Sequence, residues 1–273
     1  MFESVHPSNE ALPTPAPDKT GELPYEYIRG DLEKGLVILC DHASNKVPDT
    51  YNHLGLPPAQ FERHIAYDIG AGQVVRQLAE NLGVPAILGR YSRLLIDLNR
   101  GIDDPTMIMK LSDGAVIPGN CHIDQEEAQA RIARYYRPYH RKVDDILDQG
   151  IKMGKPPAIL SVHSFTPVWK DIPRPWHATI LWDKDSRLPE RMLQALRAQD
   201  GIVTDDNVPY SGELEGDCMN QHGTRRGLAH ALIEIRQDQI NSPAGIHEWS
   251  TRLSTMMGDI LKTGGLNQIL HFG

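Results

Sequence analysis

Residues 157–166, with the sequence PAILSVHSFT, carry the pattern that decides the fold. Small and apolar residues lead into Ser161, which is typical of a strand buried inside a sheet. His163 then lies near the carboxyl end of this segment. A histidine there is either a core residue whose ring nitrogens have hydrogen-bond partners, or a functional residue that points into a site beyond the strand. The rest of the sequence must distinguish these two interpretations.

Segments typical of strands and of helices alternate along the chain. Apolar runs predict further strands within residues 35–45, 85–100, 177–183 and 227–240. Helical spacing and end signals predict helices over residues 57–83, 124–150, 187–199 and 243–265, with a kink at Pro138. This alternation predicts an α/β fold, a three-layer sandwich in which a mixed, mainly parallel sheet has helices on both faces. In such sheets, functional residues gather beyond the carboxyl ends of the strands.

The two ends of the chain differ in composition. The first 24 residues contain five prolines and few large apolar residues, which predicts an extended arm at residues 1–24. From residue 25 onward there is no linker and no internal repeat. We therefore expect residues 25–273 to form a single domain, a length that is sufficient to bury a large core.

Composition and charge exclude several classes of partner. The formal net charge of −8 argues against nucleic acid or an anionic membrane as a partner. The three cysteines lack CxxC spacing, so no disulfide framework is expected. The first residues lack the apolar core of a signal peptide, and no apolar run of about 18 residues could span a membrane. We expect a cytoplasmic protein, and the sequence leaves its oligomeric state open.

Three polar residues lie in or just after predicted strands. His42 follows the strand within residues 35–45, His163 ends the strand at 157–166, and Glu234 interrupts the apolar run ALIEIR. Singly, each has an ordinary explanation, as a satisfied core histidine or as an outward-facing glutamate. Together they indicate a zinc hydrolase, in which imidazoles and a carboxylate bind Zn²⁺ and a separate carboxylate activates water. No GxSxG motif, Walker loop or GxGxxG motif after a strand supports another chemistry.

Several motifs also resemble those of known enzymes. SVHSF, DLNRG and IEIRQD resemble motifs of the zinc carboxypeptidases and acyl-amino-acid hydrolases. Those families carry, in order, a first metal histidine, an Asn-Arg pair, a second metal histidine and a general-base glutamate. The matching residues here are His42, Asn99 with Arg100, His163 and Glu234. More closely, CDHASNKVP together with YSRLLIDLNR resembles the N-formylglutamate amidohydrolase family, over about residues 36–234.

The resemblance implies a zinc-carboxypeptidase-like fold and a metal-dependent amidohydrolase with one Zn²⁺ per chain. The substrate implied is a small anionic N-acyl amino acid, most closely N-formyl-L-glutamate, which would give L-glutamate and formate. His42 and His163 would bind the metal, and Glu234 would be the general base. Arg93 or the metal would stabilise the tetrahedral oxyanion. The alternatives are a related hydrolase for another N-acyl amino acid or a peptide carboxyl terminus, and a non-catalytic ligand-binding protein.

The third metal ligand departs from the carboxypeptidase pattern. Those enzymes have HxxE at the first ligand, whereas this chain has His42-Ala-Ser-Asn45. An amide oxygen is a poor zinc ligand, so we expect Asp68 in the third position. The alternative is that Asp68 is an ordinary residue of an amphipathic helix. Asn45 would then orient a ligand or contact the substrate.

Arginines provide the expected receptor for the substrate's carboxylates. Arg93 and Arg100 flank the stretch LLIDLN, and a planar guanidinium binds a carboxylate through two hydrogen bonds. We expect Arg100 and Asn99 to hold the α-carboxylate, unless these arginines are merely exposed. Further substrate-binding candidates are Arg225, Arg226 and His140.

Overall fold

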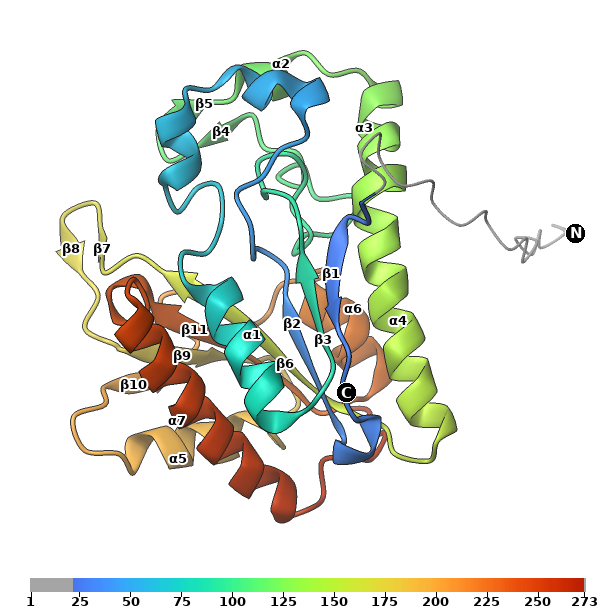
Figure 1. The fold of residues 1–273 in the computed structure, drawn as a ribbon, viewed down its shortest axis with the longest axis vertical. Coiled ribbons are helices and arrows are strands. Elements are labelled where there is room, and N and C mark those ends of the chain that lie inside the picture. Colours follow the sequence, from blue (N-terminus) through green and yellow to red (C-terminus); the bar gives the residue numbers. More distant parts are fainter. Residues whose placement is uncertain (1–21, 273) are drawn as a thin grey trace, which may run out of the picture.

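A seven-stranded sheet forms the centre of the computed structural model, which describes residues 22–272 (Figure 1). The strands lie side by side in the order β1 (Tyr25–Ile28), β3 (Ala86–Gly89), β2 (Leu36–Cys40), β6 (Ala158–Phe165), β11 (His230–Arg236), β9 (Ala178–Leu181) and β10 (Thr204–Asp206). The central strands β3, β2, β6 and β11 are parallel to one another. The edge strand β1 is antiparallel to β3, and β9 is antiparallel to β11 and parallel to the other edge strand, β10. The sheet is therefore mixed and mainly parallel, as predicted.

Helices cover both faces of this sheet. One face carries α1 (Ala71–Leu82), α5 (Pro189–Arg197) and α7 (Pro243–Lys262). The other face carries α3 (Gln125–Arg131), a π-helical turn (Ile132–Tyr136), α4 (Arg137–Lys152) and α6 (Cys218–His222). In β2, Leu36 and Ile38 pack into the first of these cores, and Val37 and Leu39 pack into the second. Since side chains alternate across a strand, this pattern confirms the predicted three-layer α/β sandwich.

Short elements complete the described chain. They are the hairpin strands β4 (Leu111–Ser112) and β5 (Ala115–Val116), the hairpin strands β7 (Val168–Trp169) and β8 (Ile172–Pro173), the helix α2 (Pro118–Cys121), and the 3₁₀ turns Leu32–Lys34, Asp49–Gly55, Pro58–Glu62, Thr224–Arg226 and Gln237–Gln239. Among the residues that the structure describes, no helix is both long and apolar enough to cross a membrane. Of the predicted arm over residues 1–24, all but the last three residues lie outside the described part of the chain.

The helix predicted over residues 57–83 is wrong in its first half. The α-helix begins only at Ala71, and Gly70 before it has a φ of 83°, which a right-handed helix does not allow. In the loop before this glycine, the backbone N–H of Asp68 donates to the carbonyl of His42 over 3.0 Å. That bond fastens the loop to the carboxyl end of β2.

The strand predicted within residues 85–100 is shorter than expected. β3 ends at Gly89, and the residues after it continue as turns beyond the sheet. There the backbone N–H of Arg93 donates to the carbonyl of Ala66 over 3.2 Å, so the segment pairs with a loop and not with a strand.

The long helix predicted over residues 124–150 is present as α3 and α4. The π-helical turn between them ends two residues before Pro138. Proline cannot donate the backbone hydrogen bond that a helix interior requires, and a wider turn accommodates the missing bond. The irregularity therefore falls where the proline predicted a kink.

Candidate active site

Polar side chains meet at the carboxyl ends of β2, β6 and β11. His42 follows the last residue of β2 by two positions, and His163 lies two residues before the end of β6. In the register of the parallel pair β6–β11, Glu234 lies directly opposite His163. Paired residues of neighbouring strands project from the same face of a sheet. The structure thus brings all three residues to one cavity of about 430 Å³.

Asp68 joins the two histidines. Its Oδ2 atom lies 2.8 Å from Nδ1 of His163 and 3.4 Å from Nδ1 of His42. The three side chains are buried, and one nitrogen or oxygen atom of each lies within 4.8 Å of the others. The two imidazole rings stand at 79° to each other, with centroids 4.9 Å apart. Both Nδ1 atoms therefore face the same carboxylate oxygen.

Each histidine is held from its far side by a second carboxylate. Nε2 of His42 lies 2.7 Å from Oδ1 of Asp97, and Nε2 of His163 lies 3.2 Å from Oδ2 of Asp41. A carboxylate accepts hydrogen bonds, so Nε2 of His42 carries the hydrogen in the neutral ring and its Nδ1 carries the lone pair. Both ring nitrogens of His163 face carboxylates, and although burial alone would lower the pKa of this imidazole, Asp41 and Asp68 raise it well above its ordinary value. Carboxylates in this position orient metal-binding histidines. The sequence interpretation missed Asp41 and Asp97, although both belong to the quoted motifs.

The buried group fits a metal ion. Nδ1 of His42 is buried and has no hydrogen-bond partner, since Oδ2 of Asp68 at 3.4 Å does not make a bond with it. A buried polar atom left unpaired costs about 1–3 kcal/mol, which a ligand at that atom would remove. Two imidazole nitrogens and one carboxylate oxygen form a donor set typical of zinc. The geometry therefore supports a metal site made of His42, Asp68 and His163.

The two carboxylates of the site, Asp68 and Glu234, differ in their pKa values. Burial alone would raise the pKa of Asp68, but the neighbouring His42 and His163 hold that pKa well below its ordinary value. Burial raises the pKa of Glu234 to about 7, against the opposing effect of His163. Oε2 of Glu234 is also buried without a hydrogen-bond partner. Asp68 is thus kept as an anion, whereas Glu234 can exchange a proton near neutral pH.

Arg93 and Asn99 line the same cavity and are held by Asp97. Nε and Nη2 of Arg93 donate to Oδ2 of Asp97 over 3.0 and 2.7 Å, and Nη1 lies 3.8 Å from Oδ1 of Asp68. The backbone N–H of Asn99 donates to Oδ1 of Asp97 over 2.9 Å. The side-chain oxygen of Asn99 accepts a hydrogen bond from the backbone N–H of Cys218 over 3.0 Å. One buried carboxylate thus positions His42, Arg93 and the Asn-Arg pair.

Arg100 also lines the cavity, and its side chain is 25% exposed. Its Nη1 donates to the carbonyl of Asn99 over 2.8 Å, and its Nε donates to Oγ1 of Thr106 over 3.2 Å. These two bonds fix the plane of the guanidinium. A fixed guanidinium loses little side-chain entropy when it binds a carboxylate.

Two of the predicted substrate-binding residues are held away from the cavity by their hydrogen bonds. Nδ2 of Asn45 donates to the carbonyl of Phe61 over 2.9 Å, which fastens a loop. His140 is buried on α4, where its ring contacts that of His222. Neither Asn45 nor His140 lines the cavity.

The arginine pair before β11 is also outside the cavity lining. The side chain of Arg225 is 57% exposed and lies 3.9 Å from a carboxylate oxygen of Glu215. Arg226 forms ion pairs with Asp144 and Asp148 of α4. The sequence could not show this, because the carboxylates of α4 come close to Arg226 only in the folded chain.

Part of the cavity wall comes from a loop for which the sequence predicted no role at the site. Side chains of the segment that follows β10 line it, among them Tyr210 and Asp217. Burial raises the pKa of Asp217 to about 6. No local pattern distinguishes these residues from an ordinary polar loop, so the sequence carried no signal for them.

Two comparisons with known proteins name the same family. A family model described as N-formylglutamate amidohydrolase matches residues 34–241. The crystal structure of gene product Atu2144 from Agrobacterium tumefaciens is 30% identical, with a TM-score of 0.84, covering 91% of this chain and 98% of that chain. The N-formylglutamate amidohydrolase from Ralstonia eutropha JMP134 is 19% identical, with a TM-score of 0.58, covering 89% of this chain and 98% of that chain. This likeness confirms the fold expected from the resemblance. No curated protein matches the chain.

Proposed function

This chain belongs to the N-formylglutamate amidohydrolase family, and from this membership we propose that it hydrolyses N-formyl-L-glutamate to L-glutamate and formate. The observation that carries the proposal is the buried group of His42, Asp68 and His163, which faces Glu234 across one cavity. A hydrolase of this family needs a metal site beside a proton acceptor, and these residues supply both.

His42, Asp68 and His163 would hold one Zn²⁺. When bound, zinc polarises the carbonyl of the scissile amide and lowers the pKa of a water molecule. Asp97 keeps the Nδ1 lone pair of His42 directed at the site, and Asp41 holds Nε2 of His163. These two carboxylates touch neither metal nor substrate in this scheme, so they are positioning residues.

Glu234 would serve first as general base and then as general acid. It would accept a proton from the attacking water and pass this proton to the nitrogen of the leaving amine. Its place opposite His163 supports this role, because the carboxylate then lies beside the metal ligands without being one of them. Its unpaired Oε2 leaves one oxygen atom available for the water.

Arg93 and Arg100 would act on the substrate's negative charges. Arg93 lies between Asp68 and Asp97, where its guanidinium can stabilise the oxyanion that forms at the acyl carbon. Arg100 and Asn99 would hold the α-carboxylate, because both line the cavity and both are fixed by hydrogen bonds.

A panel of N-formyl, N-acetyl and N-succinyl amino acids, assayed with and without chelator, tests the proposal. We expect N-formyl-L-glutamate to have the highest kcat/KM, and chelator to abolish the activity until Zn²⁺ is restored. A preference for a larger acyl group would move the assignment to another N-acyl amino acid. If the zinc-loaded protein hydrolyses none of these amides, the non-catalytic alternative replaces the proposal.

A further inference from the structure

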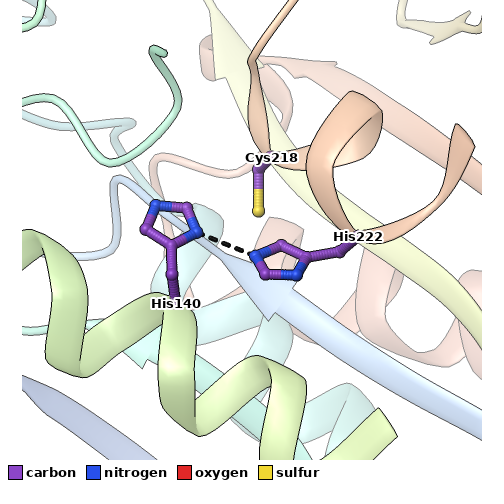
Figure 2. A group of neighbouring side chains, drawn as sticks. All are labelled: His140, Cys218 and His222. Carbon is purple, nitrogen blue, oxygen red and sulfur yellow. Dashed lines mark hydrogen bonds between the residues drawn. The ribbon is translucent and has the colours of Figure 1, made fainter. Parts of the chain in front are cut away.

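A second group of buried metal-binding side chains lies outside the cavity. His140 belongs to α4, and Cys218 and His222 belong to α6 (Figure 2). All three are buried, and one nitrogen or sulfur atom of each lies within 4.8 Å of the others. Cys218 and His222 are four residues apart on a helix, so their side chains share one face. None of the three lines the cavity described above.

The outer nitrogen of each ring faces an acceptor. Nε2 of His140 lies 3.0 Å from the carbonyl oxygen of Leu98, and Nδ1 of His222 lies 3.1 Å from Oδ1 of Asp144. A carbonyl and a carboxylate can only accept, so both outer nitrogens carry hydrogens. Arg226 donates to the same Oδ1 of Asp144 over 2.8 Å, which keeps this carboxylate ionised. The outer bonds therefore fix both tautomers.

The inner nitrogens are left facing each other. Nδ1 of His140 and Nε2 of His222 are 2.8 Å apart, and the sulfur of Cys218 points toward them (Figure 2). If both rings are neutral, two lone pairs meet without a hydrogen between them. Such a contact is stable only when a positive charge, either a proton or a metal ion, lies between or beside the nitrogens.

We propose that His140, Cys218 and His222 bind a second zinc ion, separate from the one held by His42, Asp68 and His163. Zinc prefers imidazole and thiolate ligands such as these, whereas magnesium and calcium prefer oxygen ligands. Tetrahedral zinc at about 2.0–2.1 Å would set the two nitrogens about 3.3 Å apart. The rings therefore need to separate by roughly half an ångström from their present 2.8 Å.

This ion would have a structural role beside the active site. It would fasten α6 to α4, and the two helices contact the loop that carries the Asn-Arg pair. The carbonyl of Leu98 is bound to His140, and the side chain of Asn99 is bound to the backbone of Cys218.

Cobalt substitution tests the proposal directly. The catalytic group contains no cysteine, so a thiolate-to-cobalt charge-transfer band can come only from the second site. We expect the metal-free wild type to bind two equivalents of Co²⁺ and to show this band. Cys218→Ser should bind one equivalent and lose the band. The matched control is Cys121→Ser, which makes the same change at a cysteine whose sulfur bonds to the carbonyl of Ile117.

The outcomes separate this site from the catalytic one. Asp68→Ala should keep the band while losing one equivalent of metal, and that result would support the second site whatever the activity assays show. The proposal is overturned if the wild type shows no band, if the band persists in Cys218→Ser, or if it disappears in Cys121→Ser. A shared proton between the rings is then the remaining explanation. If Cys218→Ser does not fold, His222→Gln replaces it, with the same loss expected.

Discussion

Glu234 is the residue whose replacement separates catalysis from metal binding. Glu234→Gln keeps the size of the side chain but removes the proton acceptor, so kcat should fall by about two to four orders of magnitude. Zinc content should stay at the wild-type level, because Glu234 is not among the residues that would hold the ion. Steady-state kinetics and metal analysis of one preparation measure both. A near-normal kcat would remove Glu234 from the mechanism, and lost zinc would make it a ligand.

Asp97 acts on the metal site through His42. Asp97→Asn replaces the acceptor that lies 2.7 Å from Nε2 of His42 and weakens the control of that ring's tautomer. We expect the affinity for zinc to fall about 10–100-fold, which competition with a chromophoric chelator measures. The control is Asp103→Asn, an exposed aspartate in the same segment. Equal affinities in the two variants would contradict the positioning role of Asp97.

Arg100 is the predicted receptor for the α-carboxylate. Arg100→Lys keeps the charge but loses the planar pair of donors, so KM should rise while kcat changes little. Charge-assisted hydrogen bonds contribute about 1.5–3 kcal/mol, so we expect KM to rise about tenfold or more. A substrate amidated at the α-carboxyl should bind the wild type weakly and show little further loss in the variant. Fully additive effects would place the receptor elsewhere.

At the scale of the elements, the start of α1 places Asp68. Gly70 has a φ of 83°, and a Cβ atom there would lie 2.2 Å from the carbonyl oxygen of Ile240. Gly70→Ala should therefore shift the loop that carries Asp68. We expect the free energy of unfolding to fall by more than about 1 kcal/mol, and the affinity for zinc to fall as well. Chemical denaturation and zinc titration measure the two effects.

A second glycine provides the matched control. Gly258 lies inside α7, and an added Cβ atom would meet nothing within 4 Å. Gly258→Ala should stabilise the protein by about 0.5–1 kcal/mol, because alanine is the better helix former. If both substitutions had the same effect, the conformation of Gly70 would not be what holds the Asp68 loop.

At the scale of the whole molecule, the zinc ion proposed for the catalytic group would join separate parts of the sandwich. His42 follows β2, Asp68 precedes α1, and His163 belongs to β6. A ligand that binds only the folded state stabilises it, by about 2.7 kcal/mol at a free concentration 100 times Kd. For a chain of this size we expect zinc to raise the Tm by roughly 5–10 °C. Differential scanning calorimetry measures the shift, which should be smaller in Asp68→Ala. An unchanged Tm would favour the non-catalytic alternative.

The sequence by itself determined the layers of the fold and the residues that end its central strands. Apolar runs located β2, β6, β9 and β11, and helical spacing located α5 and α7, because burial imposes a period on each element separately. His42, His163 and Glu234 could be recognised because each interrupts or ends such a run. These signals are local and need no knowledge of the neighbouring strand.

Only the tertiary structure decided which side chains meet. The strand order puts β6 beside both β2 and β11, which brings His163 opposite Glu234 and close to His42. Asp97 reaches His42 through turns that looked like a strand in the sequence. Arg226, which the sequence placed near the substrate, pairs with carboxylates of α4 instead. Contacts between residues far apart in the chain depend on strand order and loop path, and the periodicity of a single segment contains neither.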